Sequence, residues 1–182
     1  GTTSVTVNAD AYLQLDNSVN SLAARIKDSA SVTLSDGTFA LIGNGAGVTE
    51  TVGSLTLSGA ATVKVDSGAV LDVSGNATFG TGAGVNFSGT SLGSTNKITF
   101  GNGTSLNMGN LIPNATVNTN DFAYYDATNG ITTATYKSDF ASAGSDDCVK
   151  YTGPDAASIT EDKSIGGLVL NGAAVNITAG LP

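Results

Sequence analysis

Aliphatic residues alternate with small polar residues along most of this chain, and residues 53–89 show the pattern most clearly. A period of two places every second side chain on the same face of an extended strand. Clusters of Ser, Gly and Asn interrupt the alternation at short intervals, and glycine there tolerates the positive φ angles of tight turns. The pattern predicts short strands joined by short turns, with these side chains facing a core: Leu55, Leu57, Val63, Val65, Leu71, Val73, Val85 and Phe87.

A short stretch at residues 19–28, VNSLAARIKD, is the one candidate for a helix. Elsewhere β-branched Val and Thr are frequent, and glycine recurs too often for apolar residues to line up at helical spacing. We interpret 19–28 as a strand that Ala23-Ala24 disturbs. The predicted fold class is therefore all-β.

The chain also repeats itself in a degenerate way. Residues 21–44 parallel residues 54–76, and a third copy begins at Gly167 with GLVLNGAAVNITAG. One short strand buries only two or three aliphatic side chains, at about 1.5–3 kcal/mol each, whereas ordering each residue costs about 1–2 kcal/mol of backbone entropy. Coils that stack share one core and one hydrogen-bond ladder. The repeat therefore predicts a parallel β-solenoid.

Residues 113–153 break this pattern. They hold more than half of the aromatic residues, and Asn129-Gly130 is the strongest hairpin-turn signal in the chain. We interpret this segment as an irregular Tyr-rich connector or a lateral hairpin. The predicted organisation is solenoid coils in 1–112, the connector in 113–153 and the start of a further solenoid repeat in 154–182.

Composition narrows the function. Charged residues make up 12% of the chain, the formal net charge is −8, and histidine and tryptophan are absent. An acidic surface repels nucleic acid and anionic lipid, and a chain without histidine lacks the commonest general base and metal ligand. Lys64 and Asp66 lie two apart on one strand face and are best interpreted as an exposed charge pair. We expect that the chain is not an enzyme, binds no cofactor and does not insert into a membrane.

The acidic pairs Asp146-Asp147 and Glu161-Asp162 are weak candidates for calcium ligands, because hard cations prefer carboxylate oxygens. The repeated glycine- and aspartate-rich calcium pattern of some solenoids is absent from the sequence, so solvated turns are the alternative. Cys148 follows two acidic residues, which raise the pKa of a thiol. We expect either a free, unreactive thiol or a partly buried side chain there.

Other residues are candidates for contacts. Tyr124, Tyr125, Tyr136 and Tyr151 could form an interaction surface for glycan or a neighbouring chain, or a small satellite core under the connector. Both ends of the sequence stop in mid-pattern, which predicts uncapped assembly ends at Val5, Val7, Val175 and Ile177. Asparagine is expected to form ladders along the stacked coils at the five Asn-x-Ser/Thr sequons, namely Asn76, Asn86, Asn102, Asn114 and Asn176.

Taken in order, four pieces of the chain resemble the autotransporter-associated β-strand repeat proteins, which are large bacterial surface or secreted proteins. The pieces are residues 52–57 (VGSLTL), 92–100 (LGSTNKITF), 120–126 (NDFAYYD) with Asn129-Gly130, and 163–170 (KSIGGLVL). The resemblance implies a right-handed parallel β-helix at the cell exterior, with no catalytic residues to carry over.

From these observations we expect an extracellular structural repeat protein. It would form a stiff rod, a unit of a cell-surface fibre, filament or matrix in which copies or adjacent repeats join head to tail. The alternative is an adhesin passenger that binds glycan or another cell surface through the Tyr-rich segment.

Overall fold

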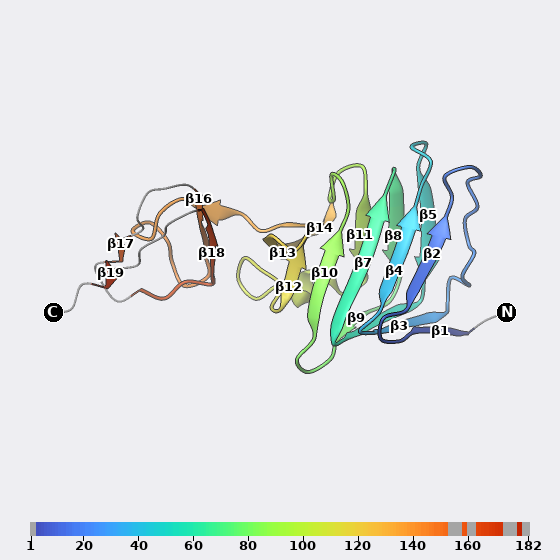
Figure 1. Cartoon of the computed structure of the whole chain (residues 1–182), viewed down its shortest axis with the longest axis horizontal. Helices are drawn as coiled ribbons and strands as arrows, with labels where there is room; N and C mark the ends of the chain where they lie inside the picture. Colours follow the sequence, from blue (N-terminus) through green and yellow to red (C-terminus); the bar gives the residue numbers. More distant parts are fainter. Residues whose placement is uncertain (1–2, 153–157, 160–162, 173–177, 180–182) are drawn as a thin grey trace.

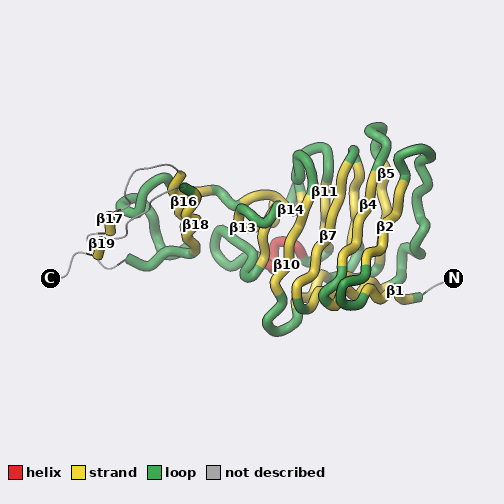
Figure 2. The backbone as a smooth tube through the Cα atoms, in the orientation of Figure 1, coloured by secondary structure: helices red, strands yellow, loops and turns green. Residues whose placement is uncertain are grey.

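The computed structural model describes residues 3–152, 158–159, 163–172 and 178–179. Within these ranges the chain is almost entirely β-strand and turn. No α-helix occurs there, and the one helical element is the short 3₁₀ helix η1 (Gly103–Leu106). Figure 2 shows the strands stacked side by side with loops at their ends. The all-β prediction is confirmed.

The first part of the chain is a β-solenoid of four coils with parallel sheets, which confirms the predicted fold class (Figure 1). One sheet has the order β1-β3-β6-β9, a second contains β2-β4-β7-β10-β12, and a third has the order β5-β8-β11. The strands are β1 (Ser4–Val7), β2 (Tyr12–Asp16), β3 (Ser31–Ser35), β4 (Thr38–Ile42), β5 (Val48–Val52), β6 (Ser54–Ser58), β7 (Ala60–Asp66), β8 (Ala69–Val73), β9 (Ala77–Phe79), β10 (Gly84–Ser88), β11 (Lys97–Phe100) and β12 (Ala115–Val117).

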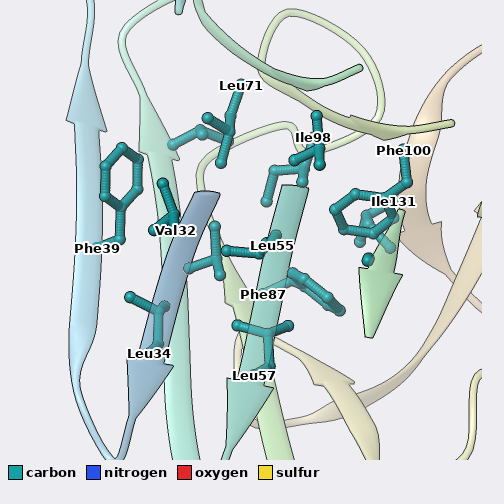
Figure 3. Close-up of a cluster of buried hydrophobic side chains, with 14 of the residues drawn as sticks. Val32, Leu34, Phe39, Leu55, Leu57, Leu71, Phe87, Ile98, Phe100 and Ile131 are labelled. Carbon is teal, nitrogen blue, oxygen red and sulfur yellow. The ribbon is translucent and has the colours of Figure 1, made fainter. Parts of the chain in front are cut away.

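Side chains of equivalent residues stack in columns through the interior. In the first sheet Val5 pairs with Val32, Val32 with Leu55, and Leu55 with Ala77. Figure 3 shows aliphatic and aromatic side chains from the three sheets meeting in one core. All of the eight side chains predicted to face inward are at most 2% exposed: Leu55, Leu57, Val63, Val65, Leu71, Val73, Val85 and Phe87. Alternation was sufficient to identify them, because successive strand residues point to opposite faces.

The pairing register corrects the repeat alignment made from the sequence. That alignment matched the segment beginning at Ser21 with the segment beginning at Ser54, but the structure pairs Ser31 with Ser54 and Ser35 with Ser58. The true equivalents are therefore SVTLS and SLTLS. The mismatch arose because loop lengths differ between coils, so the ladder and not the spacing sets the register.

Residues 19–28 form no strand, so the interpretation of this stretch as a disturbed strand is wrong. They belong to a long loop, residues 17–30, that occupies the place of a third strand in the first coil. Val19 and Leu22 are exposed, and Ile26 alone among the large aliphatic residues of 19–28 is buried. With one inward side chain, the segment lacks the alternating apolar face that a strand needs.

Beyond β12 the chain changes direction. β13 (Asp121–Asp126) pairs antiparallel with β12, and β14 (Gly130–Thr133) pairs antiparallel with β13. The hairpin predicted from Asn129-Gly130 is confirmed, with Asp126 pairing with Gly130 across the turn. A second, smaller parallel stack follows, made of β15 (Tyr136–Lys137), β16 (Cys148–Thr152) and β18 (Gly167–Asn171), with β17 (Ser158–Ile159) paired to β19 (Thr178–Ala179).

Candidate assembly and binding surfaces

β1 and β2 are the outermost strands at the N-terminal end of the solenoid (Figure 1). Within the described residues, the outer edge of neither strand pairs with another strand. The predicted assembly residues of β1 lie here: Val7 is buried in the core, and Val5 is partly exposed and packs against it. An unpaired edge of this kind can accept another parallel strand.

The third side of this end is covered by the 17–30 loop. Glu50 on β5 pairs in register with Leu71, so its side chain points inward, and it is fully buried. Its carboxylate accepts hydrogen bonds from the backbone N–H groups of Arg25 (3.1 Å) and Ile26 (2.6 Å). These bonds replace part of the ladder that a first-coil strand would have made. A carboxyl side chain in the core therefore closes the solenoid where a strand is missing.

Replacing Glu50 with alanine should release this loop. The substitution leaves the buried N–H of Ile26 without an acceptor, at about 1–3 kcal/mol, and also frees the partly buried N–H of Arg25. We expect a lower free energy of unfolding in urea and fast hydrogen exchange at the amides of Arg25 and Ile26. Glu50→Gln is the matched control, since its side-chain oxygen can still accept one of the two bonds and its loss should be smaller. Equal stability of both variants and the parent would contradict the assigned role.

The β13–β14 hairpin closes the opposite end of the four coils, and Tyr125 on β13 makes its main contact with them. Its hydroxyl donates to the carbonyl of Phe100 and accepts from the N–H of the same residue, both at 3.0 Å. Its ring stacks on that of Phe100 with centroids 5.8 Å apart. The backbone of Gly103 lies directly against this ring, so closely that a Cβ there would come within 2.0 Å of it. Tyr125 is 6% exposed.

Tyr125 is therefore a core residue, and its prediction as part of an interaction surface is wrong. The hydroxyl satisfies backbone groups at the end of β11, and the ring extends an aromatic row that runs through Phe79, Phe87 and Phe100. A buried tyrosine needs such a partner for its hydroxyl. The hairpin therefore closes this end of the four coils without a helix or a proline-rich stop.

Two more of the candidate tyrosines also make internal contacts. The hydroxyl of Tyr136 accepts the N–H of Phe122 (2.7 Å), and the hydroxyl of Tyr151 accepts the N–H of Phe140 (3.1 Å). Desolvation is the main reason that the pKa of Tyr136 rises to about 12, and the nearby Asp121 carboxylate raises it further. Both side chains are partly buried, as is Tyr124. Tyr136 thus joins the second stack to the hairpin, whereas Tyr151 holds the second stack together internally.

A separate small core confirms the satellite-core alternative for this segment. Phe140, Ala143 and Val149 are buried together, with Tyr151, Ile165 and Leu168 packed against them. The ring of Tyr151 stacks on Phe140 with centroids 5.5 Å apart. Lys150 forms an ion pair with Asp121 and lies over the ring of Tyr136, which joins this core to the hairpin.

The calcium candidates are only partly within the described residues. Asp146 and Asp147 lie in the turn before β16, where the carboxylate of Asp147 accepts from the N–H of Gly144 (2.9 Å) and from the amide of Asn110 (3.1 Å). Glu161, Asp162, Val175 and Ile177 lie outside the described residues. In the part that the structure describes, no three acidic or cysteine side chains are close enough to hold a metal ion together.

Asparagine side chains bridge neighbouring coils, but not as the predicted ladder of asparagines. Asn102 bonds both the N–H (2.8 Å) and the carbonyl (3.0 Å) of Ala77 in the coil before it. The side chain of Asn118 likewise accepts the N–H of Gly89 (3.1 Å) and donates to its carbonyl (3.3 Å). Each amide thus imitates one step of a backbone ladder where the strand has ended. Asn86 instead accepts from the N–H of Thr119 (2.9 Å), and Asn176 lies outside the described residues.

Cys148 is free, as the sequence predicted, and its side chain is fully buried, where the sequence predicted at most partial burial. Burial raises the pKa of its thiol, and the carboxylate of Asp147 raises it further. Its reactivity remains a prediction: a protonated thiol inside a strand pair is a poor nucleophile.

Comparison with family models, with curated proteins and with solved structures finds no match to this chain. No helix among the described residues has the length and apolar character needed to cross a membrane. The geometry of the solenoid therefore supports the function proposed below.

Proposed function

We propose that this chain is an extracellular structural repeat protein, a stiff β-helical element of a cell-surface fibre, filament or matrix whose units join end to end. The observation that carries the proposal is the parallel stack itself. Four coils share one continuous core, and the edges of β1 and β2 lie open at one end within the described residues. An element of this shape transmits load along its axis through strand pairing and side-chain columns.

The hairpin changes how such a rod would be built. It closes the first four coils, and the second parallel stack of β15, β16 and β18 begins only after it. Residues of the second stack contact the hairpin through the Lys150–Asp121 ion pair and the Tyr136 hydroxyl. The proposed rod is therefore a series of blocks, each closed by a hairpin at one end and joined there to the next block by contacts of this kind. Three of the four candidate tyrosines, Tyr125, Tyr136 and Tyr151, make contacts within the chain, which favours the rod over an adhesin that binds through them.

Sedimentation velocity over a wide concentration range, with negative-stain electron microscopy of the same samples, tests end-to-end joining. The chain should form linear oligomers whose length grows with concentration, because a heterologous contact does not close on itself. Particles should be uniform in width. A chain that remains monomeric at the highest concentration would overturn end-to-end joining, and closed rings or globular clusters would contradict the rod.

A further inference from the structure

A notch interrupts the row of turns that joins the second sheet to the third. The turn after β4 spans residues 43–47 and the turn after β10 spans residues 89–96, whereas only Ser67-Gly68 separates β7 from β8. Both residues of this short turn have positive φ, 58° and 78°, as a tight two-residue turn requires. The loops on either side are longer, and the loop between β4 and β5 projects beyond the upper ends of the strands in Figure 1.

The space between the two loops is a hollow of about 610 Å³. Gly45 lines one wall, Ser67 and Gly68 form the floor, and Thr90 and Thr95 line the other wall. A second hollow of about 300 Å³ shares Asp66 and Thr90 with the first and extends it toward Lys64, Ser88 and Asn118. Together the two hollows form what we call the turn groove, which crosses successive coils along the axis of the solenoid.

The turn groove is held in shape before any ligand arrives. Asn96 is 2% exposed, and its side-chain oxygen accepts the N–H groups of Gly68 (2.8 Å) and Ala69 (3.1 Å). Its amide nitrogen donates to the carbonyl of Thr90. One buried side chain therefore ties the long loop to the floor. On the other wall, the N–H of Gly45 donates to the carbonyl of Ser67 at 2.7 Å. Binding to a preformed groove costs little ordering entropy.

The polar groups that line the groove can exchange hydrogen bonds with the hydroxyl groups of a ligand. The side chains of Ser67, Thr90 and Thr95 are exposed. Asp66 accepts the N–H of Thr90 (2.9 Å) and pairs with Lys64 (3.3 Å). Burial alone would raise the pKa of Asp66, but the hydrogen bonds from Thr90 and Lys64 outweigh it and lower that pKa, so the carboxylate is ionised and can accept from a ligand hydroxyl.

These features select among ligand classes. Ile42 is the one large apolar side chain of the lining and no aromatic ring contributes, so an apolar ligand or the anchor side chain of a peptide has no pocket to fill. The net charge of −8 opposes a polyanion. We propose that the turn groove binds a neutral oligosaccharide, whose rings lie along the coils and exchange hydrogen bonds with Asp66, Thr90 and their neighbours. This inference is independent of the rod function and uses a surface away from the tyrosines.

Amide chemical shifts of the ¹⁵N-labelled chain, titrated separately with maltohexaose, cellohexaose and chitohexaose, test the proposal. At least one of these probes should cause saturable shifts at Gly45, Ser67, Gly68, Thr90 and Thr95. Tetragalacturonate, which is anionic, should cause none at these residues. Absence of saturable shifts with all three neutral probes, shifts centred on another surface, or preference for the anion would each overturn the proposal.

Three substitutions locate the site. Thr90→Trp places a large side chain in the groove and should abolish the shifts, whereas Thr56→Trp makes the same change at an exposed position on β6 and should leave them intact. Asp66→Asn keeps the shape of the groove and should weaken binding severalfold. Thermal unfolding of each variant checks that the coils remain folded. If both tryptophan variants weaken binding equally while folded, the groove is not the site. If the chain assembles into rods but binds none of the probes, the proposed oligosaccharide site is wrong and the proposed rod function stands.

Discussion

Replacing Val65 with aspartate should abolish the cooperative folding of the solenoid. Val65 is fully buried and pairs with Leu41, which pairs in turn with Leu15, so its side chain belongs to a core column that spans three coils. The substitution removes about 1.5–3 kcal/mol of apolar burial and leaves an uncompensated charge in the core, at about 3–5 kcal/mol. Their sum reaches the range of the whole stability of a typical domain, about 5–15 kcal/mol.

Circular dichroism and urea unfolding measure this effect, and the neighbouring residue supplies the control. Lys64 points to the opposite face, where it is partly exposed and pairs with Asp66 at 3.3 Å. Lys64→Ala should change the free energy of unfolding by about 0–1 kcal/mol, as removal of exposed ion pairs usually does. If the two variants were equally stable, the assignment of faces on β7 would be wrong.

Truncation of Tyr125 to alanine should produce the second large effect. It removes the ring that stacks on Phe100 and leaves the tightly packed backbone of Gly103 facing a cavity. Large-to-small changes at buried aromatic residues cost about 3–5 kcal/mol. The hairpin should detach from the end of the solenoid, with faster hydrogen exchange across β13 and β14 and a lower urea midpoint.

Tyr125→Phe separates the hydroxyl from the ring. It keeps the stacking but leaves the N–H and carbonyl of Phe100 without their partner, which should cost about 1–3 kcal/mol. Tyr124→Phe is the matched control, because Tyr124 is only partly buried and its hydroxyl makes no hydrogen bond among the residues that the structure describes. Equal loss of stability in the two phenylalanine variants would show that the hydroxyl of Tyr125 does not hold the cap.

The hairpin and the loop at 17–30 close parts of the four-coil stack, while the predicted assembly ends are untouched by them: the edge of β1 is unpaired within the described residues, and Val175 and Ile177 lie outside those residues. One end is closed by an aromatic residue that bonds to a strand backbone 25 positions away, and part of the other by a buried carboxylate that bonds to a loop. Neither device has a local sequence signature. A tyrosine among other tyrosines and a glutamate within a strand are ordinary residues until their distant partners are known.

The conformational preferences of residues close together in the sequence determined the inner face of each strand and the site of the hairpin turn. Side chains alternate across a strand whatever its neighbours are, so Leu55, Val65 and Phe87 could be placed inside from the sequence alone. Asn129-Gly130 likewise favours a turn through its own backbone preferences. The same rules excluded a helical fold and indicated that the coils must stack to bury enough apolar surface.

Only the tertiary structure decided which residues become neighbours across coils. Because loops of unequal length separate the strands, Ser31 and not Ser21 pairs with Ser54, and residues 17–30 replace a strand. The same unequal loops create the notch above Ser67-Gly68, and long-range hydrogen bonds turn Tyr125 and Glu50 into closing residues. These features depend on contacts between residues more than 20 positions apart, whereas sequence patterns report the conformational preferences of residues close together along the chain.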